Sequence, residues 1–532
     1  MVWLAVSVVA SIVASGVASG IGCQSATPDP AGLDASGPSV DAQPAPADAT
    51  PDDGAGAPTI VAGAADRFLL IGTIVTPDTV INGEVLVEGD LITCVDVAGA
   101  CAARPGAAGA TIVDTKGVIA PGLIDTHNHI LFDIFDDADW APAQLYQDHD
   151  QWPNEPRYQA MLDVKQCLVN DSQGKPAWCA QTTYGTSAGS LRCEADKWGE
   201  LKGLIAGTTS IVGLAGTTAG CFSSLARSVD AAQNGLGQDT IQTSALFPPS
   251  SPDTVCANFA TGKTAAYLVH VGEGLDAKAS GEFAKLGTIT TPPGCLYAPE
   301  TAITHGTAFT ATEFAVMAQA GMKLIWSPHS NVSLYGQTAD IPGALDLGVT
   351  VAIAPDWSMG GSQNLLDELR FARDWDHAHW NDRLSAKDLV TMATLHGAQA
   401  LALDAKLGKL AVGHLADIAV FAGDVTHPYD AILASRPEQV RLVMIGGTVL
   451  YGDAALQAAG PALPGCETLD VCGTSKFLCA ATTGTTNKLD QTYAQIHAAL
   501  SQALSDVDAL TPGDGYSFAP LAPIVTCGDA PH

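Results

Sequence analysis

The chain has 532 residues, 47% of them hydrophobic, which is enough apolar material for a large folded core and excludes disorder throughout. The 24 Lys and Arg residues stand against 56 Asp and Glu residues, which gives a formal net charge of −32 at pH 7. Such a charge repels nucleic-acid phosphates and anionic membrane surfaces, so we expect no nucleic-acid partner.

The N-terminal 22 residues are apolar or small, and the composition turns polar directly after Cys23. This pattern predicts a signal peptide over residues 1–22, with Cys23 similar to the lipid-acceptor cysteine of bacterial lipoproteins. Because no Lys or Arg precedes the apolar run and Gly20 replaces the usual leucine, an ordinary signal peptide or an uncut anchor remains open. We expect an exported protein, anchored by lipid in a bacterial cell envelope, with no other membrane contact.

Residues 23–65 are predicted to form a disordered tether behind that anchor. From residue 24 onward they hold seven prolines and six aspartates among Ala, Gly and Ser. Such a segment cannot bury enough apolar surface to order itself.

Two segments far apart in the chain, 66–117 and 409–453, are predicted to consist of short strands joined by turns. Neither segment is long enough to form a core alone. The strands are expected at residues 68–72, 83–90, 111–114, 416–421 and 440–446.

His127 and His129 end an apolar run that begins at Val118. In an extended strand, side chains two residues apart leave on the same face, so both imidazoles can reach one metal ion. Three further apolar runs end in His270, His305 and Asp356. A carboxylate at the end of a buried strand is unfavourable unless it meets a cation or hydrogen-bond donors.

With these positions in this order, the chain resembles the metal-dependent amidohydrolase superfamily, in particular its deaminase and chlorohydrolase branch. The resemblance covers roughly residues 66–453, and the ordered set of motifs is more specific than any one of them. The matching segments are residues 121–129, 270–273, 303–306, 326–331, 354–356 and 408–417.

The resemblance implies an α/β fold: a (β/α)8 TIM barrel over 118–408, beside a composite β-sandwich built from 66–117 plus 409–453. Barrel strands present their C-terminal ends to one common face, where active sites are built. A long insertion, to about residue 206, is expected to wall the site, and a helix is expected over 386–401. Later strands are expected at residues 209–213, 240–245, 267–270, 303–305, 323–327 and 351–354, and the third strand is left unassigned.

The resemblance also implies roles for the residues at the strand ends. One divalent metal, Zn2+ with Fe2+ as the alternative, would be held by residues of this set and would activate a water molecule. Glu273 would move protons as the general acid and base, and His305 would contact the water or substrate, unless it is a core histidine. A single ion is favoured because residues 240–252 contain no lysine to bridge two. The predicted metal ligands are His127, His129, His270 and Asp356, and the predicted catalytic residues are Glu273, His305 and Asp356.

Three further residues, His329, Asn331 and Trp357, are predicted to bind substrate, with loop packing as the alternative. A second His-x-His pair, His377 and His379, lies in an amphipathic stretch. On a helix, residues i and i+2 diverge, so no second metal site is expected there.

Thirteen cysteines, twelve of them after Cys23, suit an oxidising compartment. No Cys-x2-Cys pair occurs, so a zinc-thiolate site is not expected. Residues 454–532 form a cysteine-containing extension in which a helical stripe runs from Leu489 to Val507. Candidate disulfides are Cys94 with Cys101, Cys167 with Cys179 or Cys193, Cys221 with Cys256, and Cys466 with Cys472 or Cys479.

The sequence therefore predicts a metal-dependent hydrolase that cleaves a non-peptide C–N bond of a small molecule, as deaminases and cyclic amidases do. Hydrolysis of a heteroaromatic halide or of a peptide-like amide is the alternative within the enzyme class. A surface lipoprotein that binds a metal or ligand without turnover is the alternative outside it. The sequence leaves the substrate and the oligomeric state open.

Overall fold

The computed structural model describes the greater part of the compact unit Pro51–His532. The predicted signal peptide, Cys23 and residues 23–55 of the predicted tether lie outside the described residues. The described residues are 56–213, 225–230, 236, 239–461, 465–481, 490–510 and 515–528.

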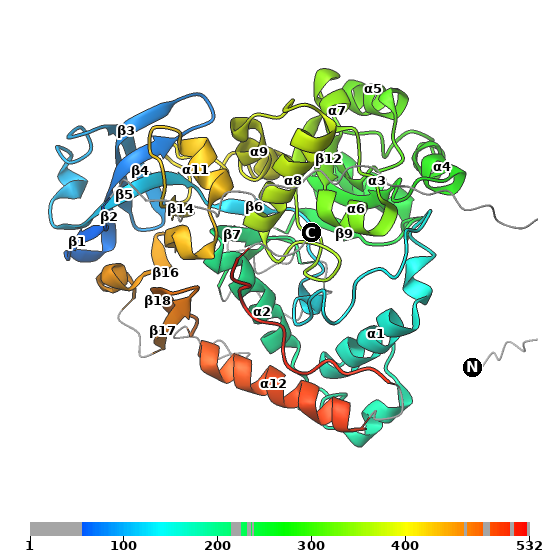
Figure 1. Cartoon of the computed structure of the whole chain (residues 1–532). Coiled ribbons are helices and arrows are strands. Elements are labelled where there is room, and N and C mark those ends of the chain that lie inside the picture. Colours follow the sequence, from blue (N-terminus) through cyan, green and yellow to red (C-terminus); the bar gives the residue numbers. More distant parts are fainter. Residues whose placement is uncertain are drawn as a thin grey trace, which may run out of the picture. The chain divides into compact units, whose positions relative to one another are not determined.

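A ten-stranded sheet unites the two segments that flank the predicted barrel (Figure 1). Strand β14, from the later segment, pairs antiparallel with β5, and Ile418 lies opposite Pro121. The strand order is β17-β18-β16-β15-β14-β5-β2-β3-β4, and β1 pairs with β5 beside this path. The strands from the earlier segment are β2 (Ala64–Val75), β3 (Val80–Glu88), β4 (Leu91–Val97) and β5 (Ala110–Pro121). Those from the later segment are β14 (Ile418–Phe421), β15 (Val440–Ile445) and β16 (Thr448–Asp453). Strand β1 (Thr59–Val61) lies in the predicted tether, so the prediction of disorder is wrong for these residues, which pair with β5.

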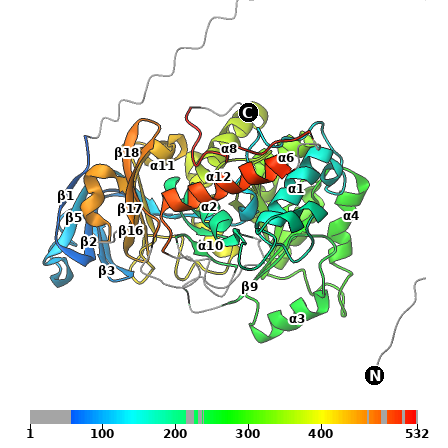
Figure 2. The same ribbon diagram turned by 90° about the horizontal axis from the view of Figure 1, so that it is seen from below.

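The C-terminal extension contributes to this sheet as well, which the sequence did not predict. Strands β17 (Cys466–Val471) and β18 (Thr474–Cys479) extend its edge, because β18 pairs with β16. The extension also contains α12 (Tyr493–Leu510), whose buried residues include Ile496, Leu500 and Val507. This helix packs along α2 (Arg192–Ile205), as Figures 1 and 2 show. At this contact Trp198 stacks on Tyr493.

Eight parallel strands form two further sheets. The order is β6-β7-β8 in one sheet and β13-β12-β11-β10-β9 in the other, and all pairings within them are parallel. A parallel bridge between Asn128 and Asp356 connects the C-terminal ends of β6 and β13. The strands are β6 (Leu123–Asp125), β7 (Thr208–Ile211), β8 (Arg227–Ser228), β9 (Ile241–Ser244), β10 (Ala266–Val271), β11 (Thr301–His305), β12 (Lys323–Trp326) and β13 (Thr350–Ile353).

The structure divides the apolar run that precedes His127. Residues up to Pro121 belong to β5 of the ten-stranded sheet, and only β6 belongs to the parallel set. Gly122 separates the two strands, and a Cβ there would lie 2.2 Å from the Thr209 side chain. The chain can therefore pass from one sheet to the other at this point only with glycine.

Helices follow most of the parallel strands along the chain. The helix predicted over 386–401 is two helices, because the backbone of Thr394 leaves the helical region and its hydroxyl donates to the carbonyl of Val390. The helices are α3 (Pro252–Thr261), α4 (Ala277–Leu286), α5 (Ala311–Ala320), α6 (Pro328–Tyr335), α7 (Ile341–Asp346), α8 (Leu365–His379), α9 (Ala386–Met392), α10 (Leu395–Ala400) and α11 (Pro428–Ala434). Short 3-10 helices are η1 (Pro105–Ala107), η5 (Pro437–Gln439) and η6 (Ala454–Ala459).

The long insertion between β6 and β7 holds helices and no strand among its described residues. It consists of η2 (Ile130–Phe132), η3 (Trp152–Asn154), α1 (Pro156–Leu168), η4 (Ala177–Gln181) and α2. Its buried and half-buried aromatic residues form one cluster with Trp357, and the ring centroid of the half-buried Trp152 lies 5.1 Å from that of Trp357. The insertion is thereby packed against the C-terminal ends of the parallel strands.

Five disulfides join described cysteines, and Cys193 is bonded as well. Three of them were among the candidate pairs. The pairing of Cys221 with Cys256 is wrong, because Cys256 is bonded to Cys295 across 39 residues, a separation that spacing cannot predict. The bonds are Cys94–Cys101, Cys167–Cys179, Cys256–Cys295, Cys466–Cys479 and Cys472–Cys527.

No helix in the described part of the chain combines the length and the apolar character that a membrane crossing requires.

Candidate functional site

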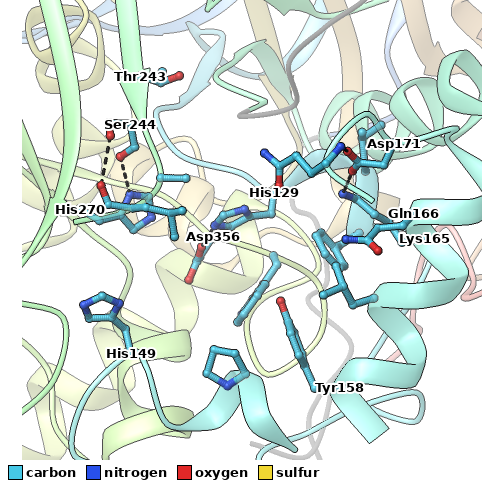
Figure 3. A pocket seen from close by; sticks show the side chains of 18 of the residues that line it. His129, His149, Tyr158, Lys165, Gln166, Asp171, Thr243, Ser244, His270 and Asp356 are labelled. Atoms are coloured by element: carbon cyan, nitrogen blue, oxygen red, sulfur yellow. Dashed lines mark hydrogen bonds and ion pairs between the residues drawn. The ribbon is translucent and has the colours of Figure 1, made fainter. Parts of the chain in front are cut away.

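The histidines and the aspartate predicted at the strand ends lie together at one end of the parallel strands. His127 and His129 follow β6, and Asp356 follows β13. His270 lies near the end of β10, and His305 is the last residue of β11. Figure 3 shows His129, His270 and Asp356 at the centre of the cavity that they line.

The backbone fixes two of these positions directly. The amide of His129 donates to the Asp356 carbonyl at 2.6 Å, and the amide of Asp356 donates to the His127 carbonyl at 3.1 Å. His305 and Asp356 adopt positive φ angles of 73° and 70°. Residues with side chains rarely adopt this region, and strain of this kind concentrates at functional sites.

Five side chains form two overlapping groups that share His127. In each group, one ligand atom from every member lies within 4.8 Å of the others: His127, His129 and Asp356 in the first, and His127, His270 and His305 in the second. The Nε2 atoms of His127 and His129 lie 2.8 Å and 3.4 Å from Oδ1 of Asp356.

The chemistry of these atoms fits a divalent cation. His127 Nε2 and Asp356 Oδ1 are buried, and no described residue gives either of them a hydrogen bond of acceptable geometry, although they are in contact. Burial lowers the pKa of His129 to about 3 and the pKa of His270 well below its ordinary value, so both rings are neutral. Burial alone would raise the pKa of Asp356, but the neighbouring histidines lower it below its ordinary value. Neutral imidazoles beside an ionised carboxylate are the donors that Zn2+ and Fe2+ take.

His270 is oriented by a backbone carbonyl. Its Nδ1 lies 3.0 Å from the carbonyl oxygen of Ser244, which can only accept a hydrogen bond. The proton of the neutral ring therefore sits on Nδ1, and the lone pair of Nε2 is available to a metal. Histidine ligands are commonly fixed in this way by a second partner.

Asp125 supports the His127 segment from behind. Its carboxylate accepts the backbone amide of His127 at 3.1 Å and the side-chain amide of Asn128 at 3.0 Å. Burial raises the pKa of Asp125 well above its ordinary value. No role was predicted for Asp125 from the sequence, although it lies two residues before His127.

Glu273 lies beside the group of donors without belonging to either set. It is 5% exposed and accepts the Tyr335 hydroxyl at 2.7 Å, and its Oε2 lies 3.8 Å from His305 Nε2. Burial raises the pKa of Glu273 to about 7. A carboxyl group whose pKa lies near neutrality can both accept and release a proton under physiological conditions.

The three predicted substrate-binding residues lie in different places. Trp357 lines the cavity, and its ring lies 5.4 Å from that of His129. His329 and Asn331 are not among the residues that line the cavity, because both are buried in α6. His329 stacks on Phe371 and Asn331 contacts His305, so neither presents its polar atoms to this cavity. The second pair, His377 and His379, lies on α8 away from any group of metal donors among the described residues.

The insertion supplies much of the cavity's opposite wall. The cavity has a volume of about 720 Å³, and Figure 3 shows Lys165, Gln166 and Asp171 across it from His270. Lys165 pairs with Asp171 at 2.8 Å, and its ammonium group lies 4.9 Å from the centre of the Phe132 ring. The cavity is thus lined by aromatic side chains near the donors and by charged side chains farther away.

Several residues of this wall were missed because their partners are distant in sequence. His149 lines the cavity and contacts Glu282 at 2.9 Å, across 133 residues. Glu282 also accepts the backbone amide of Gly272, beside Glu273, at 2.8 Å. Nothing in the sequence around His149 indicates this contact.

Comparison with known proteins agrees with the architecture. A sequence profile of the amidohydrolase family matches residues 243–450. Over these residues the chain matches the amidohydrolase family. The fold of this chain is similar to that of an atrazine chlorohydrolase variant from Arthrobacter aurescens complexed with zinc and atraton, with a TM-score of 0.55, 19% identity, and coverage of 74% of this chain and 96% of that one. An adenosine deaminase from Xanthomonas campestris with bound zinc has a TM-score of 0.50 at 16% identity over 72% and 92% of the two chains.

Two sequence relatives of this chain are named as deaminases. A 5-methylthioadenosine/S-adenosylhomocysteine deaminase from Natronomonas pharaonis is 32% identical over 28% of this chain, and the alignment spans only 37% of that relative's length. A 5'-deoxyadenosine deaminase from Methanothermobacter thermautotrophicus is 26% identical over 71% of this chain and 91% of its own length.

Proposed function

We propose that this protein is a zinc-dependent deaminase that hydrolyses the bond between a ring carbon and its amino group in a small nitrogen heterocycle. The observation that carries this proposal is Glu273, a buried carboxyl group with its pKa raised to about 7, beside a set of metal donors at the bottom of a cavity. Metal binding alone requires no such group. The names of the sequence relatives support the same reaction.

A divalent ion held by His127, His129, His270 and Asp356 would supply Lewis acidity and make a water molecule nucleophilic near neutral pH. Glu273 accepts a proton from that water as its oxygen bonds to the ring carbon. Glu273 then delivers the proton to the departing nitrogen, the C–N bond breaks, and ammonia leaves. The carbon keeps the oxygen as a hydroxyl group, whose remaining proton moves to the adjacent ring nitrogen, so the products are ammonia and the ring carbonyl compound.

The aromatic side chains that line the cavity favour a flat substrate. Trp357 lies against Trp152 and Phe132, with ring centroids 5.1 Å and 6.4 Å apart, directly beside His129. Aromatic faces of this kind pack against planar rings and exclude water. A heterocycle between this wall and the metal donors would have its amino carbon near Glu273.

The ion pair of Lys165 and Asp171 indicates that the substrate has a polar part as well as a flat ring. Both side chains are largely buried, at 12% and 13% exposed, yet both line the cavity. A single ring would not fill a volume of about 720 Å³. We therefore propose that the substrate carries a polar or charged extension that reaches this pair.

Zinc is the proposed metal because imidazole and carboxylate donors suit it, and zinc is bound in both of the solved structures compared above. One ion per chain is proposed, because the two groups of donors share His127 and the strand β9 region provides no lysine.

The test is a screen of purified, zinc-loaded protein against amino-substituted purines, pyrimidines and triazines, with ammonia release as the measurement. Chlorinated analogues of the same rings are included, and halide release is measured. Glu273→Gln serves as the inactive control. Ammonia release from at least one amino heterocycle is expected. Release of halide alone would favour a chlorohydrolase, and no release despite full zinc occupancy would favour a ligand-binding protein.

We also propose that the protein is exported and anchored through a lipid on Cys23. The five disulfides between described cysteines support an oxidising compartment. Cys23→Ser is expected to move the protein from membrane to soluble fractions while its hydrolase activity is unchanged. Membrane association that survives this substitution would indicate an uncut anchor instead.

A further inference from the structure

Tyr158 brings a hydroxyl group to the cavity from the insertion. It lies in the first turn of α1 and is 7% exposed, and it lines the cavity together with Glu273 and Asp356. Figure 3 shows its hydroxyl oxygen directed toward Asp356 at the centre of the cavity. None of the described residues forms a hydrogen bond with this hydroxyl. Buried tyrosine hydroxyls usually have a partner, so one that points unpaired into a cavity indicates a ligand.

Aromatic packing fixes the direction of the Tyr158 side chain. Its ring meets those of Trp140 and Trp152 edge to face, with centroids 5.1 Å and 5.0 Å apart. It also lies 6.5 Å from the Phe132 ring, nearly parallel to it, and 6.3 Å from the Trp357 ring. A side chain held in this way loses little conformational freedom when its hydroxyl binds a ligand.

The same packing sets the position of Tyr158 relative to Glu273. Trp152, on which Tyr158 packs, donates from its indole N–H to the Tyr335 hydroxyl at 3.1 Å. Tyr335 in turn donates to the Glu273 carboxylate at 2.7 Å. The hydroxyl of Tyr158 and the group proposed to move the proton are therefore parts of one connected arrangement, although one comes from the insertion and the other follows β10.

The Tyr158 hydroxyl is a hydrogen-bond donor at neutral pH. The ordinary pKa of a tyrosine is about 10, and burial raises the pKa of Tyr158 further. Ionised carboxylates such as those of Asp356 and Glu273 only accept hydrogen bonds, so they suit the N–H groups of a substrate. A ring nitrogen that is itself an acceptor needs a donor. Tyr158 supplies one from the insertion.

The angle between Tyr158 and Trp357 decides which part of a flat substrate the hydroxyl meets. The two rings are inclined to each other by 56°. A heterocycle stacked on Trp357 therefore cannot stack on Tyr158 as well, and its contact with Tyr158 is made at its edge. The lone pairs of acceptor ring nitrogens lie in the ring plane and point outward from this edge. A ring nitrogen is thus the acceptor that the hydroxyl can reach.

We propose that Tyr158 determines substrate specificity by donating a hydrogen bond from its hydroxyl to a ring nitrogen of the heterocycle. This inference rests on the proposed function for the class of substrate, and it adds the atom by which a substrate of that class is recognised. A ring with C–H in place of that nitrogen would leave the buried hydroxyl unpaired. Sites built around such a hydrogen bond discriminate strongly against the analogue that lacks it.

The experiment compares heterocycles that differ by one ring nitrogen. The probes are adenine with its 1-deaza, 3-deaza and 7-deaza analogues, and melamine with 2,4,6-triaminopyrimidine. Their affinities for full-length, zinc-loaded protein are measured by isothermal titration calorimetry. The parent protein for this measurement is Glu273→Gln, which leaves bound rings intact, and it is compared with the double variant that also carries Tyr158→Phe.

We expect the parent to bind at least one ring more tightly than its C–H analogue, by about 10-fold, because the analogue leaves the hydroxyl unpaired. Tyr158→Phe should remove this preference, since neither ring then has a hydroxyl to pair with. The pair of probes that loses its preference identifies the nitrogen. In protein with native Glu273, Tyr158→Phe should lower kcat/KM for a substrate that contains this nitrogen by about 10-fold.

The controls separate the hydroxyl from the packing of the insertion. Tyr158→Phe keeps the aromatic ring, so its zinc content and thermal midpoint should match those of the parent. The matched control is Tyr184→Phe, also in the insertion, whose hydroxyl donates to Asp506 at 2.6 Å and does not line the cavity. It should leave every affinity unchanged. An equal loss of preference in Tyr184→Phe would overturn the proposal, because the effect would then belong to the insertion as a whole.

The proposal is also overturned if no nitrogen preference of the parent depends on Tyr158, whether because the preference survives in Tyr158→Phe or because no ring binds. Binding that depends on Tyr158, without ammonia release by protein with native Glu273, would count against the proposed function and not against the assignment of Tyr158. Ammonia release with affinities that ignore Tyr158→Phe would have the opposite meaning.

Discussion

The two sides of the cavity are built from different parts of the chain and by different means. On one side, the metal donors lie at strand ends: backbone hydrogen bonds join Asp356 to His127 and to His129, and Asp356 has a positive φ angle. On the other, the insertion between β6 and β7 presents aromatic and charged side chains whose positions depend on contacts between distant segments.

The two sides of the cavity therefore have different functions: the strand-end side carries the chemistry, and the insertion side determines substrate selectivity. The strand-end side holds donors with a fixed geometry and protonation state, which any hydrolysis at the metal requires. The insertion side determines which molecules reach that chemistry, and an insertion can vary without disturbing the strands. Substitutions on the first side should therefore abolish turnover, whereas those on the second should shift substrate preference, pH dependence or stability.

The largest effect is expected from loss of a metal donor. His127→Ala or Asp356→Ala should remove most of the zinc and lower activity by more than about 10²-fold, since even residues behind the ligands contribute that much. Elemental analysis and ammonia release measure the two effects.

The control is His377→Ala, which changes the exposed His-x-His pair on α8. It should leave zinc content and activity at native levels. Native protein with two zinc equivalents, both needed for turnover, would contradict the single-ion assignment.

The sequence predicted the strand-end side well for a physical reason. Each donor ends or closely follows an apolar run, and that pattern depends only on neighbours in sequence. Strands β7, β9, β10, β11, β12 and β13 lie where they were expected, within a few residues. The strand-end side could therefore be predicted from local sequence patterns and from the rule that parallel barrel strands present their C-terminal ends to one face.

The rest of the structure could not be predicted, because it depends on contacts between residues that are distant in sequence or on strands too short to show a pattern. The strand left unassigned, β8, has two residues, too few to show a period. Strands β17 and β18 join the ten-stranded sheet from the C-terminal extension, for which a helix but no strand was predicted. Asn331 was predicted to face the substrate because its neighbours in sequence cannot show that His305, 26 residues away, lies against it.

The second largest effect is expected at Glu273. Glu273→Gln keeps the shape of the side chain but removes the base, so turnover should fall by about 10²-fold to 10⁴-fold while zinc is retained. Steady-state rates and elemental analysis on the same preparation test this. Loss of zinc would make Glu273 a ligand, and near-native turnover would exclude it as the base.

The pH dependence of the rate gives a second test of Glu273 as the base. Glu273 acts as a base only when ionised, so the native rate should fall as pH drops through its pKa, which burial raises to about 7. A bound cation favours the carboxylate and moves this limb to lower pH. An acid limb that remains in Glu273→Gln would belong to another group.

A smaller effect is expected where the two sides meet. Tyr335 donates to Glu273 and accepts from Trp152 of the insertion, at 2.7 Å and 3.1 Å. The hydrogen bond from Tyr335 lowers the pKa of Glu273, so its loss in Tyr335→Phe should raise that pKa and move the acid limb of kcat to higher pH. The rate should fall severalfold near pH 6 and little at pH 9.

Tyr297→Phe is the matched control, because that hydroxyl donates at 2.6 Å to the Phe283 carbonyl outside the cavity. Its acid limb should coincide with that of the native protein. An unmoved limb in Tyr335→Phe would mean that the hydroxyl does not act on Glu273 during turnover.

The smallest effect is expected where the insertion is attached to the strand-end side. His149 contacts Glu282, which also holds the amide of Gly272, and this contact raises the pKa of His149 to about 9. The protonated form is therefore favoured in the folded state. The stabilisation of the folded state by this contact is fully present below the ordinary histidine pKa of 6.5 and is lost as pH rises through about 9.

His149→Ala should lower the thermal midpoint by about 2 °C at pH 6 and leave it unchanged at pH 10. His377→Ala removes an exposed pair with Asp382 and should change neither value. A deficit in His149→Ala that is the same at both pH values would show that the ring acts by packing and not by charge.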